Sequence, residues 1–298
     1  MTASPVTAAP VAVRATLPRV RAGVRRLSWR ELVGGGGLVA FVLAAVLAGV
    51  VSPWSPDALA IGSRLQGPST AHLLGTDQLG RDLLSRILYG LRPSLESGFA
   101  AIALAAVVGV LLGLPSGYFG SVIDSIVTRI LDLLVAWPAV FLALAVVLLL
   151  GTGELQVIIA IGLAEVPVFS RLVRSIALLA ARSDHVVAAK AAGASAPRIM
   201  VRHVLPFVVA PLVVQFAIAA PQALVAEASL NYLGLGTHPP APSLGAMVSE
   251  GQAFLAYAAG PIVFPIAVIV VLVVCLTLLA DGLQDRLDPH RGAERRRP

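Results

Sequence analysis

The sequence predicts an all-α integral membrane protein with six transmembrane helices. Of its 298 residues, 57% are hydrophobic and only 13% are charged, whereas about 25% of the residues in a soluble domain are charged. Six apolar stretches are long enough to cross the hydrocarbon core of a bilayer, which takes about 20 helical residues. The net charge of +6 comes from basic residues grouped beside these stretches. This grouping indicates a membrane surface rather than a nucleic-acid partner, because no base-stacking aromatic residues lie among them.

The six stretches follow one another along most of the chain. They are residues 34–53, 97–115, 127–150, 155–177, 205–226 and 258–280. Five prolines within them are expected to kink helices: Pro138, Pro167, Pro211, Pro221 and Pro265. A membrane tolerates such kinks where a neighbouring helix or a cavity satisfies the freed carbonyl groups. The prolines therefore favour a bundle that encloses a path over a simple anchor.

Arginines and lysines predict which side of the membrane each loop faces. They are frequent before the first span, after the last span and in the loop 185–206, and they are absent from residues 229–257. The positive-inside rule therefore predicts cytoplasmic termini and a cytoplasmic 185–206 loop in a multi-pass protein of the cell membrane. The first outer loop disagrees, because it contains four arginines, but the other loops outweigh it. These arginines are Arg64, Arg81, Arg86 and Arg92.

This orientation divides the chain into five parts. Residues 1–33 form a cytoplasmic basic tail, and residues 34–53 form the first transmembrane helix. Residues 54–96 form an extracytoplasmic loop that contains an amphipathic helix. Residues 97–280 form a core of five transmembrane helices, and residues 281–298 form a second cytoplasmic basic tail.

The amphipathic helix is expected to begin near Arg81. Gly75 permits a turn before it, and Thr76 or Asp77 can cap it. Apolar residues then recur at helical spacing, at Leu83, Leu84, Ile87, Leu88 and Leu91.

Such a helix is expected to lie in the outer interface and to turn into the membrane near Ser94. Asp82 and Arg86 lie one turn apart, where an ion pair is possible. The segment can serve as a packing collar, or it can serve as a gate or docking surface.

The loop 185–206 has the composition of a short helix, a sharp turn and a second helix. Alanines around Lys190 favour a helix with little side-chain bulk, and Gly193 can adopt the left-handed conformation that ends it. Ser195 can cap the second helix, with Pro197 in its first turn. That helix leads into the fifth span at Leu205-Pro206. This shape suits a lever that transmits the movement of a partner, although an ordinary connecting loop has the same shape.

This loop resembles the EAA motif of permease subunits in binding-protein-dependent ABC importers. That motif reads Glu-Ala-Ala, three residues, Gly, and a downstream Leu-Pro. The residues that the resemblance assigns to contact with an ATPase are Val187, Ala188, Ala189, Lys190, Gly193, Ala194, Ser195, Leu205 and Pro206. Val187 stands where the family usually has Glu, so the resemblance implies that this acidic contact is absent or replaced.

The segment 74–86, LGTDQLGRDLLSR, resembles the second permease of dipeptide, oligopeptide and nickel importers, the DppC/OppC type. Its motif residues are Gly75, Thr76, Asp77, Gly80, Arg81, Asp82, Ser85 and Arg86. Residues 129–145, 169–175, 226–236 and 281–289 are similar to the same family, in the same order. The resemblance covers roughly residues 25–290 and implies an ABC type-1, MetI-like core.

The resemblance implies a non-catalytic subunit that imports di- or oligopeptides. Its implied partners are a homologous permease of the DppB/OppB type, two ATP-binding subunits, an extracytoplasmic binding protein, the peptide and membrane lipid. The chain contains no GxxxxGK[ST] phosphate loop, so ATP binding by that route is not expected. No cofactor is expected, and the five dispersed histidines do not indicate a metal site. Alternatives are import of nickel or another small solute, a secondary carrier that needs no ATPase, and an intramembrane enzyme.

Glu165 is unusual because it lies inside the fourth span, where the family more often has a small residue. Ionisable groups at membrane depth usually face a cavity or a partner. One hypothesis is that Glu165 lines the pathway and meets the ammonium group of a peptide. The alternatives are a structural hydrogen bond and exposure near the interface. For Glu227 a packing role is expected, and Asp132 is expected to pair with an arginine.

Overall fold

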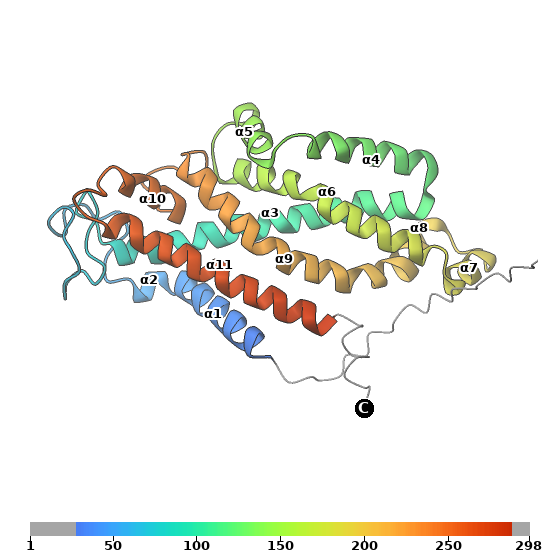
Figure 1. The fold of residues 1–298 in the computed structure, drawn as a ribbon, viewed down its shortest axis with the longest axis horizontal. Coiled ribbons are helices and arrows are strands. Elements are labelled where there is room, and N and C mark those ends of the chain that lie inside the picture. Colours follow the sequence, from blue (N-terminus) through green and yellow to red (C-terminus); the bar gives the residue numbers. More distant parts are fainter. Residues whose placement is uncertain (1–27, 288–298) are drawn as a thin grey trace, which may run out of the picture.

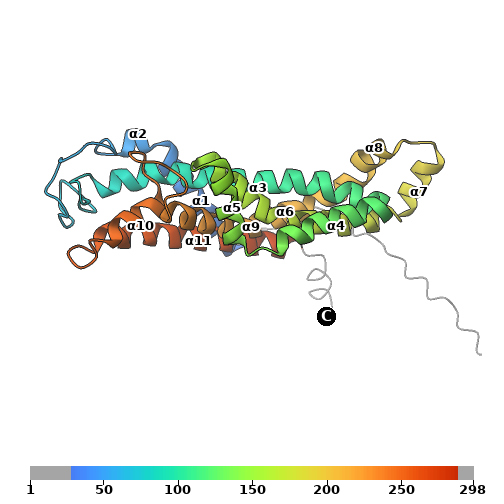
Figure 2. The ribbon, with the colours of Figure 1, turned by 90° about the horizontal axis from the view of Figure 1, so that it is seen from above.

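The computed structural model describes residues 28–287, which form a flat bundle of long helices (Figures 1 and 2). The long helices are α1 (Trp29–Val46), α3 (Leu83–Phe119), α6 (Glu154–Ala180), α9 (Leu205–Tyr232) and α11 (Gly260–Leu287). The shorter ones are α2 (Ala48–Val51), α4 (Ser121–Val135), α5 (Ala139–Leu150), α7 (Asp184–Ala191), α8 (Ala196–Ile199) and α10 (Leu244–Gln252). The predicted tails, apart from their parts within 28–287, lie outside the described residues.

Five helices or helix runs are long and apolar enough to cross a membrane, and the bent pair α4–α5 passes the same test of length and composition when its two helices are taken together. This confirms the all-helical fold with six apolar segments. The third segment differs from the expected kinked helix, because α4 and α5 meet at 93°. Pro138 lies in an extended conformation (φ −55°, ψ 136°) at the start of α5. It has no N–H to continue the helix of α4, so the chain breaks there. The other four prolines lie within uninterrupted helices.

The first span begins earlier than expected. Helix α1 starts at Trp29 because Ser28 and Glu31 form a capping box, with the Ser28 N–H donating to the Glu31 carboxylate at 2.6 Å. The glycines at 34–37 therefore lie inside the helix. Gly34 packs directly against the backbone of α11, where an added Cβ would lie 2.5 Å from the Cys275 carbonyl oxygen.

The expected turn into the membrane near Ser94 is wrong. Helix α3 runs without interruption from Leu83 to Phe119, a length of about 55 Å at 1.5 Å per residue. The apolar residues Leu83, Ile87 and Leu91 are buried in the core of the bundle instead of lying on the membrane surface. Other helices cover these three side chains, so residues 83–91 form the first part of α3 and not a separate helix on the membrane surface.

Helices α3 and α6 form the centre of the bundle and touch along a row of glycines on α3. An added Cβ on Gly109 would lie 2.5 Å from Phe169 Cβ, and one on Gly113 would lie 2.4 Å from the Ser170 carbonyl oxygen. Small residues at four-residue spacing let membrane helices approach this closely. Gly117 extends the row by one further turn. The α3–α6 contact therefore depends on the absence of side chains at these positions.

Two opposite ends of the bundle have different structures (Figures 1 and 2). Helices α7 and α8 project at one end, which we call the α7 end. Residues 52–82 and helix α10 cover the other, which we call the α10 end. Near the α7 end, Arg171 of α6 donates to Asp132 of α4 at 2.8 Å, which confirms the expected pairing of Asp132.

Candidate functional site

At the α7 end, the 185–206 loop forms a helix that is closed by a Schellman motif. Gly193 has φ +80°, and its N–H donates to the Lys190 carbonyl at 3.0 Å. The Ala194 N–H donates to the Ala189 carbonyl at 3.1 Å. These two bonds satisfy the last carbonyls of α7 and fix the direction of the turn. The left-handed conformation expected for Gly193 is confirmed.

Helix α7 is anchored to the bundle from one side. Val186 and Ile199 are fully buried in an apolar cluster with Val173 of α6 and Val208 of α9. The Lys190 ammonium group also lies 4.7 Å from the ring centroid of Tyr118 at the end of α3, at the distance of a cation–π contact. The loop that contains α7 is therefore packed against three long helices, α3, α6 and α9.

The second part of the loop is continuous with α9. Ser195 occupies the N-cap position of α8, but its side chain makes no capping hydrogen bond, unlike the expectation. A π-helical turn over Met200–Val204 follows, in which the Leu205 N–H donates to the Met200 carbonyl. Pro206 has no N–H to complete the α-helical pattern with Arg202, which favours this wider turn. The loop thus enters the membrane span with no flexible linker.

The other side of α7 is exposed. Val187, which replaces the usual Glu of the motif, is 55% exposed. Four further exposed residues have little or no side chain, Ala188, Ala191, Ala192 and Gly193, and three exposed polar residues lie on the same helix, Asp184, His185 and Lys190. This surface leaves room for the close approach of another protein.

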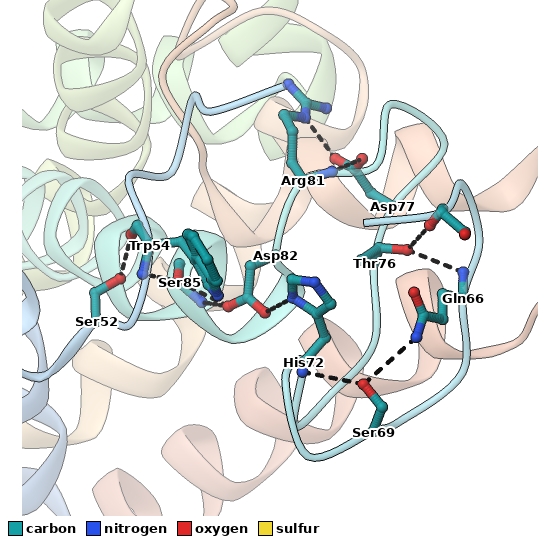
Figure 3. A network of polar contacts seen from close by, with 11 residues as sticks. Ser52, Trp54, Gln66, Ser69, His72, Thr76, Asp77, Arg81, Asp82 and Ser85 are labelled. Carbon is teal, nitrogen blue, oxygen red and sulfur yellow. Dashed lines mark hydrogen bonds and ion pairs between the residues drawn. The ribbon is translucent and has the colours of Figure 1, made fainter. Parts of the chain in front are cut away.

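At the α10 end, the residues of the 74–86 motif form a buried polar network (Figure 3). The helix cap is Asp82 rather than Thr76 or Asp77. Its carboxylate accepts from the Ser85 N–H at 2.8 Å, and its other oxygen lies 3.0 Å from His72 Nδ1. The Asp82 carboxylate is therefore bonded to Ser85 and His72, and the Asp82–Arg86 ion pair that the spacing allows does not form.

A second group of charges joins this motif to α10. The Asp77 carboxylate accepts from the Arg81 N–H at 2.9 Å and from Arg81 Nε at 2.5 Å. Glu250 of α10 accepts from Arg81 Nη2 at 3.0 Å and from Arg86 Nη2 at 3.2 Å. Arg86 is only 1% exposed. The motif therefore ties residues 52–82 to α3 and α10, as a packing collar would.

The glycines of the motif allow residues 75–80 to pack closely against the backbone of residues 60–67. Gly75 has φ +82°, and an added Cβ would lie 2.2 Å from the Gln66 carbonyl oxygen. Gly80 has φ +71°. The Thr76 hydroxyl donates to the Ser63 carbonyl at 2.5 Å. All eight motif residues thus lie in one connected structure.

Replacing Glu250 with glutamine should destabilise this end of the molecule. Within residues 28–287, Arg81 and Arg86 would keep only Asp77 as an ion-pair partner, and a hydrogen bond to a charged group contributes about 1.5–3 kcal/mol. We expect a lower melting temperature for the purified protein in detergent. The matched control is Glu96→Gln, because Glu96 bonds Arg92 on an exposed face of α3. Equal melting temperatures for the two variants would contradict the stabilising role of the Glu250 ion pairs at the α10 end.

Between the two ends, a cavity of about 480 Å³ lies between α5, α6 and α9. Its walls are mainly alanine, valine and leucine side chains. Glu165 of α6 lines it, together with Gln222 and Ser229 of α9. Glu227 lies on the opposite side of α9, where it is buried and accepts from Asn231 Nδ2 at 2.6 Å.

The structure therefore keeps the predicted site residues in three separate places. The motif residues 75–86 lie at the α10 end, the 187–206 residues lie at the α7 end, and Glu165 lies between them. Sequence reasoning missed Glu250 and His72, which complete the collar from distant positions. It also missed the glycine row, although the four-residue spacing of Gly109, Gly113 and Gly117 was a usable signal. Within residues 28–287, no three His, Cys, Asp or Glu side chains are grouped as metal ligands.

Comparison with known proteins agrees with this architecture. A family model described as "Binding-protein-dependent transport system inner membrane component" matches residues 109–292. The dipeptide transport system permease protein DppC of Alkalihalophilus pseudofirmus is 39% identical over 252 residues, which cover 85% of this chain and 83% of that protein. The glutathione transport system permease protein GsiD of Pectobacterium atrosepticum is 38% identical over 290 residues, with 93% and 96% covered.

A solved structure shows the same fold at lower identity. A chain of the inward-facing MetNI methionine ABC transporter matches 68% of this chain and 96% of its own length, with a TM-score of 0.54 and 19% identity. The family model and the two relatives are decisive, because each extends over most of the sequence. This chain belongs to the family of inner-membrane components of binding-protein-dependent transport systems.

Proposed function

We propose that this chain is one permease half of an ATP-driven importer of di- or oligopeptides. One observation carries the proposal: α9 is continuous from the end of the 185–206 loop, which we call the coupling loop, to the wall of the cavity between α5, α6 and α9. Movement of α7 would pass through the packed cluster around Val186 and along α9 to the cavity. A permease that is driven from one face needs such a rigid connection.

The proposed partners follow from the two ends of the bundle. The basic loops favour a cytoplasmic α7 end, where one of two ATP-binding subunits would sit on the exposed face of α7. A homologous permease would complete the pathway, and an extracytoplasmic binding protein would deliver the peptide at the α10 end. Closure of the ATPases on ATP would move α7 and open the cavity outward, and hydrolysis would reset it. The ATPases must therefore dock with different free energies in the two states.

The names of the relatives favour peptide over nickel as cargo. The two relatives described above are named for dipeptide and glutathione transport. Glutathione is itself a small peptide, so both names point to the same chemical class. Membership of a binding-protein-dependent family also argues against a carrier that works without an ATPase.

The test is uptake of a labelled dipeptide and of nickel by cells that lack only this gene. We expect loss of dipeptide uptake with unchanged nickel uptake, and recovery when the gene is returned. Deletion of the partner ATPase gene should abolish the same uptake. Loss of nickel uptake alone would show that the cargo is nickel and not a peptide. Dipeptide uptake that persists without the ATPase would contradict the ATP-driven mechanism.

A further inference from the structure

Glu165 is the one charged side chain among the described residues that line the central cavity. It is half-buried, and no hydrogen bond or ion pair joins its carboxylate to any other residue within 28–287. The two nearest arginines along α6 are already paired. Arg171 donates to Asp132 at 2.8 Å, and Arg174 forms a two-bond ion pair with Asp124.

An unpaired carboxylate between apolar walls is costly, because it loses hydration without gaining a partner. Replacing it with an apolar residue would remove that cost. Its presence therefore makes chemical sense where a cation enters the cavity and completes the pair. The chain supplies no such cation from its described residues, so the partner has to come from outside it.

The opposite wall of the cavity, formed by α9, contains two polar side chains, Ser229 and Gln222. The Ser229 hydroxyl donates to the Val225 carbonyl at 2.7 Å and is thereby occupied. Gln222 has an amide that can donate to a carbonyl or carboxylate oxygen. Apolar side chains such as Val140 and Leu230 lie around both groups. A volume of about 480 Å³ is within the usual range of small-ligand sites.

We infer that Glu165 binds the terminal ammonium group of a peptide as it passes between α5, α6 and α9. This inference rests on the proposed function and adds to it. The permease would then select for a free amino terminus by itself, in addition to any selection by the binding protein. Gln222 would contact the peptide backbone, and the valine and leucine side chains would tolerate apolar residues.

The first experiment compares two substrates in the complete reconstituted transporter, with its partner permease, ATPases and binding protein. Uptake of dialanine and of N-acetyl-dialanine is measured for the native chain and for Glu165→Gln. The ratio of free to acetylated uptake should fall by about tenfold, the scale of one charge-assisted hydrogen bond. Glu165→Asp should keep most of the native ratio. Because every variant receives peptide from the same binding protein, the preference of that protein cancels from the comparison.

A second readout measures occupancy of the cavity without transport. Cys275 is the only cysteine in the sequence and is buried, so a Cys275→Ser background allows Ser229→Cys to be labelled alone. Dialanine should slow this labelling, and Glu165→Gln should raise the half-protecting concentration by about tenfold. Val168→Cys is the control, because Val168 is exposed on α6 and is not among the cavity-lining residues.

The outcomes separate this inference from the proposed function. If the native transporter takes up no dialanine, the proposed function fails. If it takes up dialanine but Glu165→Gln changes neither the ratio nor the half-protecting concentration, only the inference fails. Loss of the partner permease from purified Glu165→Gln would assign Glu165 to the contact between the two permeases and would also overturn the inference. Glu96→Gln should leave both readouts unchanged.

Discussion

Replacing Gly113 with leucine is expected to prevent the permease from accumulating in the membrane. A Cβ at this position would lie 2.4 Å from the Ser170 carbonyl oxygen and 2.9 Å from Val173 Cβ. The first of these is a backbone atom and cannot move without shifting α6. Helices α3 and α6 form the centre of the bundle, so the larger side chain must separate them. We expect a loss of at least about 3 kcal/mol of stability, at the upper end of the cost of overpacking a core.

The measurement is the amount of full-length protein in isolated membranes, followed by the melting temperature of any protein that can be purified. Gly36→Leu is the matched control. Gly36 also lies within a membrane helix, but an added Cβ there would meet no atom within 4 Å. The control should accumulate normally. Equal amounts and equal melting temperatures of the two variants would show that α3 and α6 do not approach each other as closely as described.

The Gly193→Pro variant is expected to assemble with its partners and yet to lose peptide uptake. Proline fixes φ near −65°, whereas Gly193 has φ +80°. Proline also lacks the N–H that donates to the Lys190 carbonyl. The turn would open, and α7 would no longer be held in a fixed direction relative to α9. Under the proposed mechanism, ATP hydrolysis would then continue without moving the cavity wall.

Uptake and ATP hydrolysis should be measured together in the reconstituted transporter. A graded pair of variants provides the control. Gly193→Ala and Gly120→Ala both place a side chain at a position with positive φ, +80° and +62°, and neither added Cβ meets an atom within 4 Å. Backbone strain of this kind costs about 1–3 kcal/mol. Only Gly193→Ala should lower the uptake per ATP hydrolysed. Normal coupling in Gly193→Pro would contradict the role of this loop.

Much of the molecule could be predicted from local sequence signals. Apolar runs of about 20 residues must form helices in a bilayer, because the backbone has no other hydrogen-bonding partner there. The turn at Gly193 was predictable because a glycine after a short alanine-rich helix favours a left-handed C-terminus. The pairing of Asp132 with an arginine was predicted as well, although the sequence did not show that this arginine would be Arg171.

Two of the expected features that proved wrong depended on how the segment packs in the folded chain. An apolar stripe over 83–91 has the same spacing whether it lies on a membrane surface or inside a bundle. Only packing against the other helices decided that α3 is one continuous helix. In the same way, Asp82 could bond Arg86 or cap a helix, and the proximity of His72 and Ser85 favoured the cap. The local sequence pattern therefore allowed both arrangements of residues 83–91 and both roles of Asp82, and it did not decide between them.

The sequence by itself determined the all-helical class, the six apolar segments and the sharp turn of the coupling loop, because these depend on hydrogen bonding and hydrophobicity within short stretches. The tertiary structure alone decided three other features. It set the 93° bend between α4 and α5, brought Glu250 to Arg81, and placed Glu165 in the cavity opposite Gln222. Glu250 and Arg81 lie far apart in the chain, as do Glu165 and Gln222, and the angle of the bend depends on how α4 and α5 each pack on α6. The energy of such packing depends on all neighbours at once, so no single stretch specifies it.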